Sequence, residues 1–293
     1  MALNYDKLMK MPPERLRQAY ATRDTMLYAL GVGVGAGNPV DPAELSFCYE
    51  RNLRTLPTMA VVLANDIMRW SRPEFGVNYA LMLHADVSLV VHKPLPTAGV
   101  VYSDTRMAEI YDKGEKGALA YAQRDLYDEH TREQLATVTD GWFFRGEGGF
   151  GGKSSGAPKA LAVPERAPDL TVKLPAIMNQ ALIYRLSGDY NPLHADPERA
   201  VEACFERPIL HGLCAYGMAG RALVRHLCDN DPERFRRLDV RFTSPVYPGE
   251  LLELRIWNNG RGTASFRMVA SERGTVVEDF GRFDFEPAVG TPE

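Results

Sequence analysis

Two side chains that can transfer protons stand five positions apart in the second half of the chain. Asp189 and His194 provide a carboxylate and an imidazole, both common general acids and bases. On an α-helix this spacing would direct them about 140° apart, and Pro192 between them disfavours a helix. A loop is therefore expected, and a loop can aim both groups at a common point. The alternative interpretation is a capped turn over Gly-Asp-x-Asn-Pro with an incidental histidine beside it.

A second group of interest follows at His211-Gly212. The segment from Gly212 to Leu227 carries apolar residues at helical spacing and small residues at Gly217 and Gly220, so we expect a helix that lies close against a sheet. The first N–H groups of a helix have no partner within it, and glycine lets a ligand approach them closely. Such a site can stabilise an oxyanion. An oxyanion site beside an acid–base pair suits enolate chemistry on a thioester.

The elements that must position these groups are repeated along the chain. Residues 86–91 form an alternating strand that runs into a proline-rich turn at 93–96, and residues 239–242 do the same before the turn at 245–249. This repetition indicates an internal duplication of antiparallel strands, each with one buried face. A sheet that wraps one helix is a hot dog. The expected fold class is therefore α+β, a double hot dog of two antiparallel sheets that each wrap a helix.

A segment rich in glycine, serine and proline divides the chain. Its composition is incompatible with a helix or a strand, so residues 146–164 are interpreted as a linker. The 293 residues are about twice the usual domain length of ~150. We expect one hot dog in residues 1–145 and a second, carrying Asp189 and His194, in residues 165–293.

Composition argues against several other classes of protein. Lys and Arg number 34 against 38 Asp and Glu, so the net charge of -4 provides no overall positive field for nucleic acid. The four cysteines lack the spacing of a zinc site, and no metal is expected. No segment resembles a signal peptide or approaches the ~20 apolar residues of a membrane span, so a cytoplasmic location without membrane contact is expected. The glycine run at 31–37 lacks the third glycine of a dinucleotide motif and predicts a turn after a helix.

The stretch Ser187-Gly188-Asp189-Tyr190-Asn191-Pro192-Leu193-His194 resembles the signature of the MaoC-like hydratase 2 family. Other stretches resemble the hydratase region of the peroxisomal multifunctional enzyme, and together they cover nearly the whole chain: Arg23-Asp24, Leu27-Tyr28-Ala29-Leu30-Gly31-Val32-Gly33, Lys93-Pro94-Leu95-Pro96, Asp112-Lys113-Gly114, Gly149-Phe150-Gly151-Gly152, and Phe242 with Pro245-Val246-Tyr247-Pro248-Gly249. The first half has no second Asp-x-Asn-Pro-x-His. One active site per chain is therefore expected, and the resemblance implies that the first half accommodates a long or bulky acyl group.

The resemblance implies specific roles for residues in these stretches. Asp189 and His194 would be the catalytic pair, Asn191 would support their loop, and the Gly212 amide would meet the thioester oxygen. Substrate contacts are expected from the following residues: His84, Lys113, Tyr190, Pro192, Leu193 and Phe242. Lys113 can also be read as a solvated hairpin lysine and Phe242 as a core aromatic. His84 is followed by Ala85 where the family usually has glycine, which weakens the expectation for His84.

The activity implied is the addition of water to trans-2-enoyl-CoA to give (R)-3-hydroxyacyl-CoA, a reversible reaction of fatty acid or sterol side-chain metabolism. The coenzyme A thioester is the substrate, and no metal or organic cofactor is expected. A homodimer is the habit of the family. Two rivals remain at this point: a hot dog thioesterase, which would hydrolyse the same ligand, and a non-catalytic acyl-CoA-binding protein. The acyl chain itself is left open.

Overall fold

Ten strands form one continuous antiparallel sheet in the computed structural model, which describes residues 3–288. The strands are β1 (Glu14–Tyr20), β2 (Met82–Val91), β3 (Gly99–Asp112), β4 (Gly117–Asp128), β5 (Gln134–Arg145), β6 (Leu170–Pro175), β7 (Phe235–Phe242), β8 (Leu251–Gly260), β9 (Thr263–Ala270) and β10 (Thr275–Phe285). Their order across the sheet is β1-β3-β4-β5-β2-β7-β10-β9-β8-β6.

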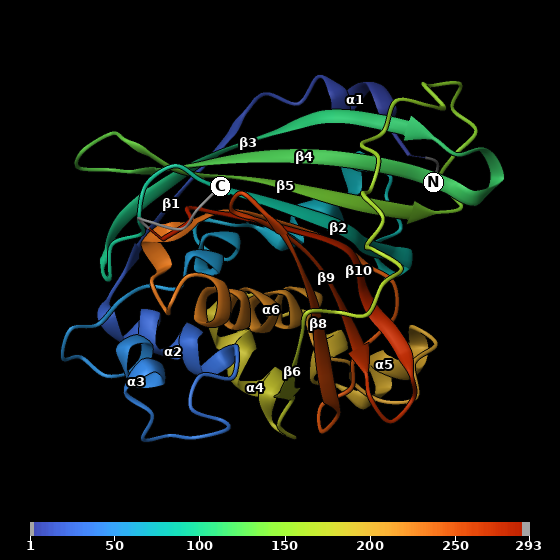
Figure 1. The fold of residues 1–293 in the computed structure, drawn as a ribbon. Helices are drawn as coiled ribbons and strands as arrows, with labels where there is room; N and C mark the ends of the chain where they lie inside the picture. The colour runs from blue at the N-terminus through green and yellow to red at the C-terminus, as the bar shows by residue number, and fades with distance from the viewer. Residues whose placement is uncertain (1–2, 289–293) are drawn as a thin grey trace.

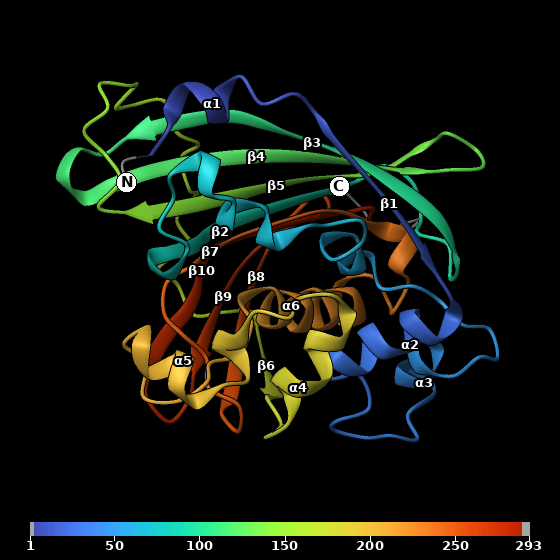
Figure 2. The same ribbon diagram turned by 180° about the vertical axis from the view of Figure 1, so that it is seen from behind.

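This order repeats itself about the centre of the sheet. Read outward from the centre, the first half runs β2-β5-β4-β3-β1 and the second runs β7-β10-β9-β8-β6, so each strand has a counterpart five positions later in the chain order. The internal duplication and the double hot dog expected from the sequence are confirmed. The two predicted sheets join edge to edge into the one sheet of Figure 1, because β2 and β7, both labelled in Figure 2, pair with Val87 opposite Val240. This pairing removes two exposed strand edges.

The helices gather on one face of the sheet (Figure 2). The α-helices are α1 (Tyr5–Met9), α2 (Thr22–Gly31), α3 (Pro42–Cys48), α4 (Gln180–Tyr184), α5 (Pro197–Glu202) and α6 (Gly212–Leu227). Short 3-10 turns lie between the helices and strands: η1 (Pro57–Val61), η2 (Ile67–Ser71), η3 (Pro73–Phe75), η4 (Tyr79–Leu81), η5 (Gly114–Lys116), η6 (Arg185–Ser187), η7 (Pro192–His194) and η8 (Pro232–Arg234). Within residues 3–288, no helix has the length and apolar character needed to cross a membrane.

Helix α6 spans the residues predicted for it, and its small residues allow close packing. A side chain at Gly217 would overlap Val32, just after α2, and one at Gly220 would overlap Thr58 of η1. Only Gly220 also faces the sheet, where Leu238 would lie 3.2 Å from an added Cβ. The glycines therefore bring α6 against elements of the first half, whereas the sequence suggested close contact with a sheet.

The first half lacks a counterpart to this long helix among its described residues. The turn η1 lies in the interior instead. A five-residue turn satisfies few of its carbonyl groups internally, so these buried groups need hydrogen-bond donors from elsewhere. The buried guanidinium of Arg124 donates to the carbonyl oxygens of Ala60, Val61 and Leu63 at 2.7 to 3.1 Å. A buried arginine thus stabilises a short turn where the second half has four turns of helix.

The segment 146–164 contains no helix or strand, as its composition predicted. Its first part is nevertheless held in place, because the Asp112 carboxylate accepts hydrogen bonds from the N–H groups of Gly149 and Gly151, each at 2.8 Å. The segment passes in front of the sheet in Figure 1, whereas Figure 2 shows the helices on the opposite face. The division into domains 1–145 and 165–293 stays a prediction, and residues 1–2 and 289–293 lie outside the described part.

The glycine run after α2 forms a turn, as predicted. Helix α2 ends at Gly31, and Gly33 and Gly35 adopt φ values of +83° and +77°, which residues with a side chain rarely adopt. No strand precedes this run, since α2 does. A dinucleotide site of the strand–loop–helix type is therefore excluded at this position.

Candidate active site

The loop that carries Asp189 and His194 is built by local hydrogen bonds. The Asp189 carboxylate accepts from the N–H of Asn191 at 3.2 Å, and the Asn191 side-chain oxygen accepts from the N–H of Leu193 at 3.1 Å. The second bond caps η7, which Pro192 begins. The chain thus turns between the two residues instead of continuing a helix, and Asn191 caps the turn; its role in catalysis stays a prediction.

His194 is buried and held in one orientation. Its Nδ1 lies 2.9 Å from the carbonyl oxygen of Ile209 and must carry a proton to donate to it, so Nε2 presents its lone pair. Burial lowers the pKa of His194 below its ordinary value, and the opposing effects of the Asp189 charge and the Ile209 carbonyl do not reverse this. The imidazole is therefore neutral near pH 7 and able to accept a proton.

His211 is a member of this group to which the sequence analysis assigned no role. Its ring stacks on that of His194 with centroids 3.7 Å apart, and its Nε2 donates to the main-chain oxygen of Asp189 at 3.1 Å. Burial, reinforced by His194, holds the pKa of His211 well below its ordinary value. The available signal was its place directly before Gly212, at the start of the predicted helix. His211 thus links the loop of Asp189 to helix α6.

Gly212 opens α6 beside this group. The N–H groups of Cys214 and Ala215 bond to the carbonyl of His211, whereas the N–H groups of Gly212 and Leu213 precede the first intrahelical bonds. An added Cβ at Gly212 would lie 3.2 to 3.4 Å from the ring of Phe242, which is tighter than ordinary contact. Glycine therefore leaves room at the positive end of a 16-residue helix.

One cavity of about 320 Å³ brings these residues together. Its polar lining includes Asp189, Asn191, His194, His211 and the helix start at Gly212. The apolar side chains of Leu193 and Phe242 lie beside them. The first half of the chain contributes a largely apolar wall, formed by Ile67, Tyr79, Met82, Leu83, His84, Trp142 and Arg145. The cavity thus extends from the acid–base pair of the second half to the first half, as expected if an acyl group occupies it.

His84 lies within this wall. Its ring stacks on Trp142 with centroids 4.2 Å apart, lies 5.1 Å from the ring of Phe242, and places Nε2 3.1 Å from the Asp140 carboxylate. The sequence prediction that His84 and Phe242 stand near the ligand is therefore compatible with their positions. Their contact with substrate stays a prediction.

Three of the predicted contact residues do not line the cavity. The Lys113 ammonium donates to the carbonyl oxygen of Ser154 at 2.8 Å, and the exposed ring of Tyr190 lies against the Arg185 guanidinium. Pro192 serves as the first residue of η7. The exposed Arg145 at the end of β5 does line the cavity, although the sequence offered no motif that singled it out.

Glu278 on β10 is a further cavity residue that the sequence did not single out. Glu278 lines the cavity and is 1% exposed, and neither of its carboxyl oxygens has a hydrogen-bond partner among residues 3–288. Burial raises the pKa of Glu278 to about 8. The carboxyl is therefore uncharged at neutral pH and can both donate and accept a hydrogen bond.

Three side chains of the site also lie close enough together to bind one metal ion. Among residues 3–288, Asp189, His194 and His211 are the one such group, with ligand atoms within 4.8 Å of one another. His194 Nδ1 and His211 Nε2 each face a carbonyl oxygen, so each ring offers one remaining nitrogen. Acid–base work and metal binding therefore compete for the same two nitrogens.

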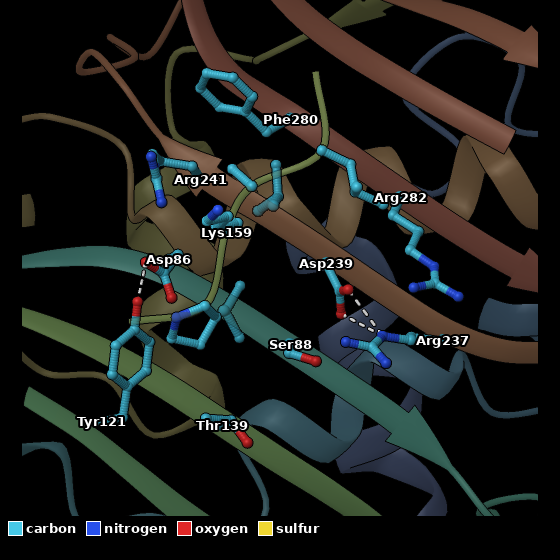
Figure 3. Close-up of a pocket in the computed structure, with 15 residues that line it drawn as sticks. Asp86, Ser88, Tyr121, Thr139, Lys159, Arg237, Asp239, Arg241, Phe280 and Arg282 are labelled. Atoms are coloured by element: carbon cyan, nitrogen blue, oxygen red, sulfur yellow. Dashed lines mark hydrogen bonds and ion pairs between the residues drawn. The ribbon is translucent and has the colours of Figure 1, made fainter. Parts of the chain in front are cut away.

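A second cavity of about 290 Å³ lies under residues 158–161 (Figure 3). It is lined by four cationic side chains, Lys159, Arg237, Arg241 and Arg282, and by Asp86 and Asp239. Four of its charged side chains are already engaged, because Arg237 bonds to Asp239, Arg282 bonds to Asp284, and Asp86 accepts from the Tyr121 hydroxyl at 3.2 Å. None of the predicted site residues lines it, so the first cavity is the candidate active site.

Comparison with known proteins confirms the resemblance noted in the sequence. The MFE-2 hydratase 2 N-terminal domain matches residues 18–146, and the MaoC like domain matches residues 159–279. The 3-hydroxyacyl-thioester dehydratase Y of Mycobacterium tuberculosis is 40% identical over 279 residues, which cover 91% of this chain and 93% of that protein. The peroxisomal multifunctional enzyme type 2 of Mus musculus is 39% identical over 280 residues, and these cover 93% of this chain but 37% of the mouse protein.

A solved structure is similar over the same extent. The crystal structure of a MaoC-like dehydratase from Phytophthora capsici superposes with a TM-score of 0.86 at 36% sequence identity. The match covers 98% of this chain and 100% of that one. The similarity therefore includes both halves, the segment between them and the loop that carries Asp189 and His194.

Proposed function

Because the chain belongs to the hydratase 2 family of MaoC-like dehydratases, we propose that it adds water to trans-2-enoyl-CoA and forms (R)-3-hydroxyacyl-CoA. One observation carries the proposal: Asp189, His194 and the start of α6 at Gly212 line the same cavity. The R configuration follows from family membership. Dehydration is the same reaction in reverse, and the two directions share one transition state.

The reaction needs a water molecule activated between the carboxylate and the imidazole. His194 presents the lone pair of Nε2, because its Nδ1 proton is engaged by the Ile209 carbonyl. The oxygen of water bonds to the β-carbon while its proton passes to the Asp189–His194 pair, and the pair delivers a proton to the α-carbon. A positioned acid or base contributes ~10² to 10⁴ in rate. The pair is left unchanged at the end of each turnover.

Charge moves to the thioester oxygen during the addition. The N–H of Gly212 lies at the N-terminus of α6, where the helix dipole adds to its hydrogen bond. Loss of one oxyanion donor typically raises the barrier by ~3 kcal/mol. Because the thioester itself acidifies the α-carbon, these side chains and this amide supply the elements that the proposed reaction requires.

The acyl chain would occupy the wall of the cavity that the first half contributes. Ile67, Met82 and Trp142 offer apolar surface there, while the exposed Arg145 can meet a phosphate of coenzyme A. The acyl chain of a fatty acid or a sterol side chain is apolar enough to pack against this wall. The predicted contacts of His84, Leu193 and Phe242 belong to the same proposal.

Assembly and location are further parts of the proposal. The outer strands β1 and β6 end the sheet and leave strand edges through which a second copy can pair, which supports the predicted homodimer. Light scattering coupled to gel filtration would give twice the chain mass of 32.6 kDa. The cytoplasmic location and the absence of nucleic acid and membrane partners stay predictions.

The decisive experiment follows the loss of enoyl-thioester absorbance with trans-2-enoyl-CoA of short, medium and long chain, with chiral analysis of the product. Rapid loss with an (R)-3-hydroxy product is expected. Release of free coenzyme A would identify a thioesterase instead. Binding of every thioester without turnover would identify a non-catalytic acyl-CoA-binding protein.

A further inference from the structure

Glu278 is a buried carboxyl that the proposed addition of water does not use. Its strand β10 lies between β7 and β9, where Glu278 stands opposite Phe242 on one side and Met268 on the other. The pairing is irregular on both sides of Glu278 along the strand. A glutamate thus lies on a cavity wall between two apolar neighbours.

Two polar side chains of α6, those of Cys214 and Tyr216, lie within electrostatic range of an ionised Glu278 but form their hydrogen bonds elsewhere. The Cys214 thiol donates to the carbonyl of Gly31, and the Tyr216 hydroxyl donates to the carbonyl of Leu238 at 2.9 Å. Both oxygens of Glu278 are therefore left without a partner from residues 3–288.

Such a group is costly unless a ligand satisfies it. A buried polar atom without a hydrogen bond destabilises the fold, so native proteins rarely keep one without a use. An apolar side chain of similar size would fit the apolar neighbours of Glu278 without this cost. Its place on the cavity wall indicates that the missing partner arrives with the substrate.

We propose that Glu278 selects an acyl chain that carries an uncharged oxygen function, a hydroxyl or an oxo group, and binds that group by hydrogen bonding. The proposal rests on the proposed hydratase function and names the substrate class of the same site. An uncharged carboxyl can donate to an oxo group and can donate to or accept from a hydroxyl.

The acyl chain, not coenzyme A, is the part that reaches this carboxyl. Coenzyme A is polyanionic and keeps its phosphates near solvent, whereas hydrophobic burial draws the acyl chain into closed apolar space. Glu278 is 1% exposed and lies among Val277, Phe242 and Leu213 on the cavity wall. A partner that is buried there must come from the apolar end of the thioester.

The test compares matched substrates with the full-length protein. The panel consists of trans-2-enoyl-CoA thioesters of one chain length, either unsubstituted or with a single hydroxyl or oxo group at successive carbons beyond the double bond. We expect kcat/KM for at least one oxygenated member to exceed that of the plain chain by about tenfold or more, because a site built for a polar group rejects an analogue that lacks it.

Two variants then assign the preference to Glu278. Glu278→Met keeps the length but removes both oxygens, and it should reduce the preference to within about threefold, because kcat/KM for the oxygenated chain falls much more than kcat/KM for the plain chain. Glu278→Gln keeps a donor and an acceptor and should preserve part of the preference. Val277→Ala, on the same strand and the same wall, serves as the matched control and should change both members of the pair by the same factor.

The possible results distinguish failure of the role proposed for Glu278 from failure of the proposed hydratase function. A wild-type protein that hydrates the plain chain but prefers no oxygenated member overturns the role of Glu278 and leaves the hydratase function intact. Equal loss on both members in Glu278→Met also overturns it, because Glu278 would then act on a part common to all the thioesters. A wild-type protein that hydrates no member overturns both proposals.

Discussion

The imidazole of His211 lies against the imidazole of His194, with ring centroids 3.7 Å apart at an angle of 29°. The same ring donates from Nε2 to the main-chain oxygen of Asp189. One side chain at the start of α6 therefore contacts both members of the acid–base pair. This relationship fixes the two residues relative to the helix whose first amide is proposed to meet the thioester oxygen.

His211→Phe tests this positioning role. Phenylalanine keeps a ring against His194 but leaves the Asp189 carbonyl without its donor, which typically costs ~1–3 kcal/mol. We expect kcat to fall by about 10- to 100-fold with little change in KM, since the loop of Asp189 shifts without loss of the substrate wall. Steady-state kinetics measure this effect. His226→Phe, on the same helix but outside the cavity, should retain wild-type kcat, and a KM effect alone for His211→Phe would contradict the positioning role.

The pH dependence of kcat/KM reports the protonation of His194. Burial lowers the pKa of this imidazole below its ordinary value of 6.5. Its Nε2 is therefore still unprotonated, and able to accept a proton, at pH values somewhat below 6.5. Activity is lost only as pH falls through the lowered pKa, which places the acid limb of the profile below pH 6.5. A profile measured from pH 4.5 to 9 checks this. An acid limb centred above pH 7 would show that His194 is not the group that titrates.

Asp189→Asn separates chemistry from folding. Asparagine keeps the side-chain oxygen that accepts from the Asn191 amide, so the loop should fold normally. The variant loses a proton acceptor, and kcat should fall by ~10² to 10⁴. Asp196→Asn is the matched control, because Asp196 caps α5 outside the cavity and asparagine caps equally well. Near-wild-type activity of Asp189→Asn would move the acid–base role to another residue.

Removal of metals should leave turnover unchanged. His194 and His211 each present one free ring nitrogen beside Asp189, which is also what a zinc ion requires. The proposed mechanism needs one of these nitrogens for the proton of water. Incubation with EDTA, gel filtration and assay test the point. Inactivation that added zinc reverses would assign the three residues to a metal.

Arg145 and Lys113 differ in their access to coenzyme A. Arg145 is exposed and lines the cavity, whereas the Lys113 ammonium is bound to the Ser154 carbonyl. Arg145→Ala should raise KM for an enoyl-CoA by about tenfold, the loss of one charge-assisted bond to phosphate. Lys113→Ala should raise it less. The reverse order would support the contact that the sequence predicted for Lys113.

The local sequence determined the features that depend on neighbouring residues. Pro192 between Asp189 and His194 required a turn, the spacing of apolar residues from Gly212 to Leu227 required a helix, and alternating residues before the two proline turns required paired strands. These follow from backbone geometry and side-chain periodicity, which act over a few residues. The turn between Asp189 and His194 and the duplicated sheet could therefore be predicted without a structure.

The tertiary structure decided which side chains from distant segments meet. His211 stacks on His194 across 17 positions of sequence, and Glu278 reaches the same cavity from a strand near the end of the chain. Neither carries a local pattern, because an isolated histidine or glutamate has no periodicity. The joining of the two sheets through β2 and β7, the replacement of a central helix by η1 and Arg124, and the unpartnered carboxyl of Glu278 all arise from packing between segments. Burial and hydrogen-bond satisfaction depend on the whole fold, so only the folded chain shows them.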